Sequence, residues 1–321
     1  MRLKWALVVV GLGLGLALAQ QPEQTPTINV SVNVVNILCS VRDSKNALLP
    51  NLTKDDFTVT EEGKPQDIKY FARETDLPLT LGLLVDVSGS ERNMIEIEKR
   101  AADQFFGKVL RKQDMAFLMS FGSEAELLQD STNSVVLLRH GLDSLRLKTP
   151  ASGPLPGAVP TINQARGTVL FDAVYLAATD MLRKEVGRKA VVLLTDGQDE
   201  GSRVKLEQAI AEAQKSDLII YGILYVDPSF FRGQGTIYST GDGDLRRMSE
   251  DTGGHMFRVD RRTTLESVFQ EIQDEMRSQY SIGYVAPDSA PGTYRRVEVR
   301  AKQKGLKVQA RKGYYAAKPG A

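Results

Sequence analysis

The sequence predicts an α/β protein with a doubly wound, mostly parallel sheet flanked by helices and a small β-sandwich formed by the N- and C-terminal flanks. Between residues 79 and 276, short apolar runs alternate with segments of helical periodicity, which is typical of parallel strands joined by crossover helices. Strand-like segments lie on both sides of this region, at 28–73 and 280–310. The 321 residues, of which 42% are hydrophobic, suffice for one sizeable domain and a smaller one.

The start of the chain predicts a signal for export. Residues 1–19 combine a charged beginning, an apolar stretch at 5–16 and the small-x-small sequence Ala17-Leu18-Ala19, which is typical of a cleaved secretory signal peptide. The alternative is a membrane anchor, but the apolar stretch is shorter than the ~20 residues that span a bilayer. A polar linker is expected at 20–27. We therefore expect an exported protein, periplasmic or secreted, with no transmembrane segment after signal cleavage.

The N-terminal β segment is expected at residues 28–76. Its strand-like runs are rich in β-branched and aromatic residues and are separated by turn-forming residues. Glu62-Gly63-Lys64-Pro65 predicts a hairpin connection. The predicted strands are 28–41, 57–60 and 68–71.

The α/β domain is expected at residues 77–278. Its strands are continuous apolar runs, as is typical of parallel strands that are buried on both faces. A polar stretch follows Phe121 and precedes the next helical pattern. The predicted strands are 79–85, 115–121, 190–194, 218–226 and 256–259.

The same domain contains segments in which apolar residues recur every three or four positions. This spacing predicts helices with one face toward the sheet. The first helix is expected to bury Met94, Ile97, Ala101, Phe105 and Val109. A Pro/Gly-rich loop is expected at 149–160. The other helical patterns lie at 135–147, 170–181, 206–213, 245–248 and 265–276.

The C-terminal β segment is expected at residues 279–315 and the tail at 316–321. From residue 280 to the end there are nine Lys or Arg against two Asp or Glu. Because charged and apolar residues alternate along the predicted strand 294–301, this basic character is mainly that of a half-exposed antiparallel sheet. Its strands, with 280–285 and 306–310, are expected to pair with the N-terminal ones. A docking surface for an anionic envelope polymer or lipid is the alternative.

Oxygen-bearing side chains in three loops predict a metal site. Asp86, Ser88 and Ser90 follow the first strand of the α/β domain at i, i+2 and i+4, so one tight turn can present a carboxylate and two hydroxyls to a common point. Asp196 follows a later strand, and Thr168 precedes a helix. Loops at the carboxyl ends of strands meet at one edge of such a sheet. Hard oxygen ligands favour Mg²⁺, with Mn²⁺ or Ca²⁺ as alternatives, and about six coordination positions leave room for an outside ligand.

These residues match a known motif. The chain resembles von Willebrand factor type A (VWA) domains over residues 78–277, because Asp86-x-Ser88-x-Ser90, Thr168 and Asp196 fill their metal-ion-dependent adhesion site (MIDAS). With its flanks, it resembles an exported VWFA-related family that is abundant in Acidobacteria. The resemblance implies a Rossmann-like fold. It also implies a non-enzymatic binding protein, in which the ion bridges to an Asp or Glu carboxylate of a protein partner.

Other functions are less well supported by the sequence. The five residues could hold a structural ion, or Ser90 and Thr168 could merely cap helices. An envelope scaffold or assembly factor, with contacts made by the basic β-module, is therefore the alternative function. The formal net charge of +1 argues against a nucleic-acid partner. A hydrolase is disfavoured, because neither His140 nor His255 lies near a Gly-x-Ser-x-Gly turn.

Overall fold

A computed structural model provides the structure of the protein. The expected signal peptide, linker, Ser90, Pro/Gly-rich loop and most of the tail lie outside the described residues. Residues 33–321 form one compact unit. The structure describes residues 34–73, 77–88, 95–146, 167–225, 241–260, 262–287 and 289–316.

A six-stranded sheet forms the centre of the α/β domain, in the order β10-β9-β8-β5-β6-β7. All neighbouring pairs are parallel except β6 and β7, which are antiparallel. Every residue of β5, β8 and β9 is buried, which explains their continuous apolar sequences. The predicted doubly wound, mostly parallel fold is thus confirmed. The strands are β5 Leu79–Asp86, β6 Met115–Phe121, β7 Ala125–Thr132, β8 Arg188–Thr195, β9 Leu218–Leu224 and β10 Met256–Arg258.

Strand β7 is not among the predicted strands. It occupies the polar stretch after Phe121 and forms an edge of the sheet, so none of its residues is fully buried. Two register irregularities interrupt its pairing with β6. Because such bulges break the alternation of polar and apolar residues, the sequence of β7 lacks the usual strand pattern.

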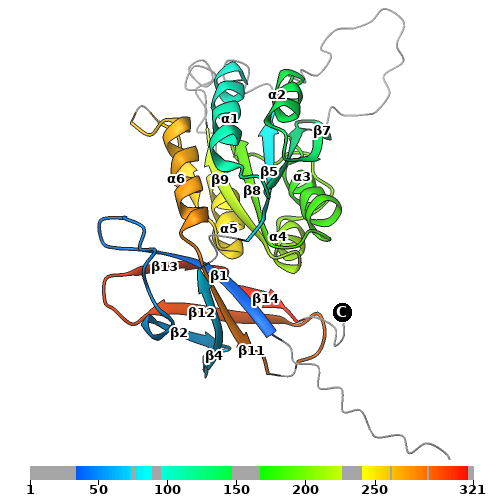
Figure 1. Cartoon of the computed structure of the whole chain (residues 1–321). Coiled ribbons are helices and arrows are strands. Elements are labelled where there is room, and N and C mark those ends of the chain that lie inside the picture. Colours follow the sequence, from blue (N-terminus) through cyan, green and yellow to red (C-terminus); the bar gives the residue numbers. More distant parts are fainter. Residues whose placement is uncertain are drawn as a thin grey trace, which may run out of the picture. The chain divides into compact units, whose positions relative to one another are not determined.

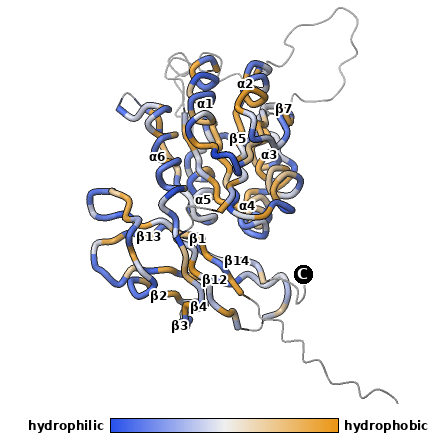
Figure 2. The backbone as a smooth tube through the Cα atoms, in the orientation of Figure 1, coloured by the Kyte–Doolittle hydropathy of each residue, from blue (hydrophilic) through white to orange (hydrophobic). Residues whose placement is uncertain are grey.

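Helices cover both faces of the central sheet (Figure 1). One apolar core lies under α1, α2 and α6, and a second lies under α3, α4 and α5. Polar and apolar segments alternate along α1 and α2, as expected of helices with one face toward a core (Figure 2). None of the described helices has the length and apolar character needed to span a membrane. The helices are α1 Ile95–Val109, α2 Val135–Asp143, α3 Leu170–Leu176 with a π-helical extension Ala177–Leu182, α4 Leu206–Lys215, α5 Asp242–Thr252 and α6 Leu265–Arg277.

The buried face of α1 differs from the prediction at one position. The sequence predicts Ile97 on the buried face, whereas the structure leaves Ile97 half-buried and buries Glu98, which is 1% exposed. The buried stripe follows Ile95 and Glu98 to Ala102 and Phe105, in steps of three or four residues. A carboxylic acid therefore occupies a position that helical geometry assigns to the core.

The two flanks form paired antiparallel sheets, as predicted. The sheet orders are β13-β1-β11-β4 and β14-β12-β2-β3, so each sheet combines strands from both ends of the chain. A third apolar core draws residues from both sheets, including Ile37 and Val297. The short strand β14 was not predicted. The strands are β1 Val34–Arg42, β2 Phe57–Glu61, β3 Lys64–Gln66, β4 Ile68–Arg73, β11 Tyr280–Val285, β12 Tyr294–Ala301, β13 Lys307–Ala310 and β14 Gly313–Tyr315.

Buried ion pairs join the sandwich to the α/β domain. Arg42 of β1 lies 2.6 Å from Glu275 of α6 and 3.0 Å from Glu271. The side chains of Arg42 and Glu275 are 7% and 1% exposed. Because the pair between Arg42 and Glu275 is shielded from water, the junction is an integral part of the fold.

Candidate functional site

The two predicted aspartates lie at the same edge of the central sheet. Asp86 is the last residue of β5, and Asp196 directly follows β8. These strands are neighbours, and Val85 pairs with Leu194 one step before the ends. Asp86 is 0% exposed and Asp196 is 5% exposed. The parallel pairing of β5 and β8 therefore places both carboxylates at the carboxyl edge of the sheet.

Hydrogen bonds fix the orientation of Asp86. Its Oδ1 accepts a hydrogen bond of 2.9 Å from the backbone N–H of Ser88, which forms a local turn. Its Oδ2 accepts one of 2.7 Å from the hydroxyl of Thr195. The Thr195 hydroxyl in turn accepts one of 3.0 Å from the N–H of Gly197. The sequence did not single out Thr195, whose role depends on the pairing of β5 with β8.

The environment of Asp86 disfavours a negative charge. Burial and, to a smaller extent, the charge of Asp196 raise the pKa of Asp86 to about 7, although hydrogen bonds from Thr195 and Ser88 oppose the shift. Among the described residues, no Lys or Arg forms an ion pair with either aspartate. The two carboxylates thus lie at one edge of the sheet and repel each other, and no described Lys or Arg is paired with them. A divalent cation would supply a compensating positive charge.

Thr168 is attached to the loop that follows Asp196. Its carbonyl accepts hydrogen bonds of 3.0 and 3.1 Å from the N–H groups of Glu200 and Gly201. The next residue, Val169, donates one of 2.8 Å to the carbonyl of Gly122 at the end of β6. Val169, with no side-chain capping bond, is the N-cap of α3. The alternative in which Thr168 is that cap is therefore wrong.

The residue before Thr168 must be small. A β-carbon on Gly167 would lie 2.3 Å from Cβ of Glu200 and 2.7 Å from its Oε2. Both distances are far below a van der Waals contact, so glycine permits the close approach of the two loops. Gly167 thereby holds Thr168, which is 9% exposed, in its place beside the loop after β8.

The chemistry of these side chains fits a hard cation. Asp86, Ser88, Thr168 and Asp196 offer carboxylate and hydroxyl oxygens from loops that hydrogen bonds tie together. Ser90, the fifth predicted ligand, lies outside the described residues. The described residues contain no cluster of three or more His, Cys, Asp or Glu arranged to hold a metal ion. Any ion at this edge of the sheet would thus need the hydroxyl groups as ligands.

Glu98 is a buried acid that the sequence prediction did not single out. It lies on α1, the helix that follows the Asp86 loop, and is 1% exposed. Burial raises its pKa well above the ordinary value, and the charge of Asp86 adds to the shift. Its Oε2 has no hydrogen-bond partner. The signal in the sequence was the spacing of Glu98, which lies three or four residues from apolar positions of the same amphipathic helix.

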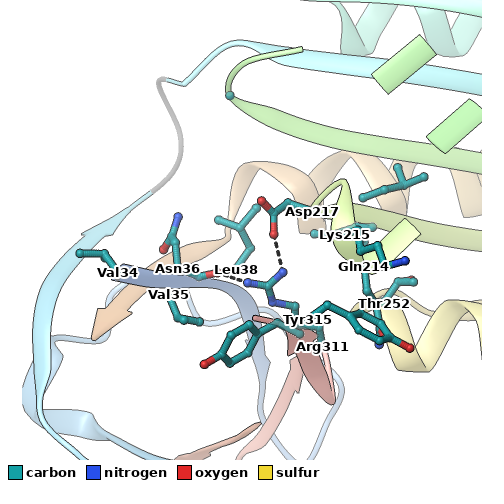
Figure 3. A pocket seen from close by; sticks show the side chains of 14 residues that line it. Val34, Val35, Asn36, Leu38, Gln214, Lys215, Asp217, Thr252, Arg311 and Tyr315 are labelled. Atoms are coloured by element: carbon teal, nitrogen blue, oxygen red, sulfur yellow. Dashed lines mark hydrogen bonds and ion pairs between the residues drawn. The ribbon is translucent and has the colours of Figure 1, made fainter. Parts of the chain in front are cut away.

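A cavity of about 280 Å³ lies at the junction with the sandwich, and none of the predicted ligands lines it. Its charged groups are already paired. Arg311 contacts Asp217 and donates a hydrogen bond of 2.6 Å to the carbonyl of Asn36 (Figure 3). Lys215 lies over the ring of Tyr315 and also pairs with a glutamate of α4. This cavity is therefore separate from the candidate metal site.

Comparisons with known proteins agree with the architecture described above. Residues 156–271 match the family model described as the von Willebrand factor type A domain. No curated protein matches the chain.

Several solved structures are similar to the chain. A von Willebrand factor type A protein from Catenulispora acidiphila is 13% identical, with a TM-score of 0.45, and covers 91% of this chain and 75% of its own. BatB from Bacteroides thetaiotaomicron is 18% identical, with a TM-score of 0.45, and covers 62% and 97%. Proximal thread matrix protein 1 from the mussel byssus, described with a zinc-occupied MIDAS motif, is 14% identical, with a TM-score of 0.47, and covers 68% and 50%.

Domains of the matched family commonly bind a divalent metal at the MIDAS and mediate protein interactions. Residues 156–271 of this chain are thus matched by the von Willebrand factor type A family model, and the mostly parallel central sheet is in keeping with that match.

Proposed function

We propose that this protein is an exported, non-enzymatic binding protein whose VWA domain holds Mg²⁺ and thereby binds a carboxylate of a protein partner. Mn²⁺ and Ca²⁺ are the alternative ions. The observation that carries the proposal is the pair of buried, mutually repelling aspartates at one sheet edge, Asp86 and Asp196, with which no described Lys or Arg forms an ion pair. Burying two like charges without such a partner is costly in free energy. A bound cation would relieve that cost.

The residues that would hold the ion are Ser88, Ser90 and Thr168 through hydroxyls, and Asp86 and Asp196 directly or through water. When bound, the ion supplies a positive charge that attracts an external carboxylate. Neutral hydroxyl ligands leave more of that charge for an incoming anion than an all-carboxylate set would.

The protein orients these groups in advance. The hydroxyl of Thr195 holds Asp86, and the backbone N–H of Gln198 donates a hydrogen bond of 3.0 Å to Asp196. The hydrogen bonds from the N–H groups of Glu200 and Gly201 to the carbonyl of Thr168 hold the Thr168 loop beside the loop that follows Asp196. Because the loops are linked before an ion arrives, little reorganisation is needed for binding.

A second candidate is an envelope scaffold whose basic β-module makes the contacts with an anionic polymer or lipid. The observation that favours it is a row of exposed cationic side chains on β12 and in the turn after it, namely Arg296, Arg300, Lys302 and Lys304. Arg300 is, however, paired with Glu298 at 2.6 Å, and Glu62 also lies beside this strand. The mixed signs of charge make this surface the weaker candidate.

Calorimetric titration of the purified protein with Mg²⁺ and Mn²⁺ tests the main proposal. We expect saturable binding that Thr168→Ala and Asp86→Asn weaken or abolish while the folded state is retained. The second step is titration with a blocked Gly-Glu-Gly peptide, with Gly-Gln-Gly as its control, in the presence and absence of Mg²⁺. Binding of the acidic peptide that needs Mg²⁺ would support the carboxylate bridge. If Mg²⁺ binds and raises the stability of the protein but does not affect peptide binding, a structural ion would be favoured.

A further inference from the structure

We infer that Glu98 is a third acidic residue of this site, a positioning residue that supports Asp86 from helix α1 and strengthens ion binding. The inference rests on the proposed function, because Glu98 would strengthen the binding of the same divalent cation. Glu98 is not one of the five residues of the metal-site motif, and its position became apparent only from the fold.

The burial of Glu98 is unfavourable unless something compensates it. Its neighbours on the inward face of α1 are apolar, including Ile95, Ala102 and Phe105. Its side chain is 1% exposed, and its Oε2 has no hydrogen-bond partner. An unsatisfied buried oxygen typically costs about 1–3 kcal/mol, and more if it is charged. Packing alone therefore does not explain a glutamate at this position.

The other buried glutamates of the chain show what a structural acid looks like. Glu275, 0% exposed, lies 2.6 Å from Arg42. Glu61, 1% exposed, lies 2.7 Å from Arg295 and accepts a hydrogen bond of 2.7 Å from Tyr284. Each of these acids has a cationic partner inside the protein. Among the described residues, Glu98 has no such ion pair.

The charge of Asp86 acts on Glu98, and its effect is repulsive. Asp86 therefore lies within electrostatic reach of two other acidic groups, Asp196 and Glu98. A divalent cation would convert the repulsion between these groups into attraction toward a common charge. Since α1 follows the Asp86 loop directly, Glu98 would also link the ion to the position of this helix.

The experiment compares Glu98→Gln with Glu275→Gln, a matched change at another buried helical glutamate. Mg²⁺ affinity is measured by calorimetry, and thermal stability is measured with and without Mg²⁺. For Glu98→Gln we expect Mg²⁺ to bind about tenfold more weakly, as for other groups that support metal ligands. The metal-free melting temperature should be equal to or above that of the wild type, because the cost of burying an unpaired acid is removed. For Glu275→Gln we expect a lower melting temperature and unchanged Mg²⁺ affinity.

Glu98→Asp provides a second variant, since it keeps the charge and should retain more of the affinity than Glu98→Gln. Wild-type affinity in Glu98→Gln, with or without a loss of stability, would overturn the inference and leave the proposed function standing. Absence of saturable Mg²⁺ or Mn²⁺ binding by the wild-type protein would overturn both. The two failures are thus distinguished by the wild-type titration.

Discussion

Buried acidic groups at the domain junction and at the carboxyl edge of the central sheet are arranged in opposite ways. At the junction, Glu275 pairs with Arg42 across the boundary between α6 and β1. At the sheet edge, Asp86 is repelled by Asp196, and Glu98 is repelled by Asp86. Burial is similar in the two regions, so burial does not distinguish them. The two regions differ in whether the protein itself supplies a positive charge that pairs with the buried acid. The region without such a pair is the better candidate for binding an external cation.

Removing the cation of the junction should produce the largest effect. Arg42→Met leaves Glu275 buried without its partner, and breaking a buried pair in this way typically costs about 3–5 kcal/mol. We expect a loss of that order in the free energy of unfolding, measured with urea, and unchanged Mg²⁺ affinity. The control is Arg139→Met, which breaks the exposed pair with Asp103 and should cost under about 1 kcal/mol. Equal losses in the two variants would contradict the structural role assigned to the junction.

The sheet edge should make metal-free stability depend on pH. The folded protein holds the pKa of Asp86 at about 7, above the ordinary 3.8. Between these values the folded state binds more protons than the unfolded state, so stability is highest at low pH and falls as pH rises toward 7. At about 1.4 kcal/mol per pKa unit, the upper limit of this loss is about 4 kcal/mol. Glu98, whose pKa is also raised, acts in the same direction.

Urea unfolding in the presence of a chelator, at several pH values, measures this dependence. Asp86→Asn should flatten the curve, and Mg²⁺ should restore stability to the wild type near neutral pH without affecting the variant. A wild-type curve that rises between pH 4 and 7 by as much as that of the variant would show that the aspartates are not in conflict.

A smaller effect is expected from Gly167→Ala. The new β-carbon would overlap Glu200 and displace Thr168 from the loop after β8, at a cost of about 1–3 kcal/mol. We expect Mg²⁺ affinity to fall together with stability. Gly107→Ala is the matched control, because a β-carbon there meets no atom within 4 Å and alanine favours the helix. If both variants bind Mg²⁺ as the wild type does, the position of Thr168 is not important for the site.

The smallest effect is expected on the outer surface of the sandwich. Arg300→Ala removes an exposed pair with Glu298, whose side chains are 71% and 53% exposed, so stability should change by less than about 1 kcal/mol. Sedimentation with vesicles of anionic and of neutral lipid, using Arg300→Ala combined with Lys304→Ala, tests the scaffold function. Loss of binding to anionic vesicles alone would favour that function over the metal bridge.

Much of the fold could be predicted because its strands and helices have strong local patterns. The fully buried strands β5, β8 and β9 are continuous apolar runs, and α6 has its apolar residues on one stripe. Strand β7 escaped prediction because an irregular edge strand needs no regular alternation. In α1, the prediction chose Ile97 over Glu98 because an acid on a buried face contradicts the hydrophobic pattern itself.

The candidate site was predictable to a similar extent. The sequence alone determined the types and spacing of Asp86, Ser88, Ser90, Thr168 and Asp196, and it placed both aspartates after apolar strands. That both aspartates lie at the carboxyl edge of the sheet was expected from the fold class, whereas the pairing of β5 with β8 is known only from the structure.

Only the tertiary structure decided what surrounds those residues. The hydrogen bond from Thr195 to Asp86 and the burial of Glu98 beside it depend on strand pairing and on the rotation of a helix against the sheet. The partnership of Arg42 with Glu275 joins residues that are 233 positions apart. Local sequence patterns specify which segments form strands and helices, but the charges that meet across them depend on how those segments pack, which no single segment encodes.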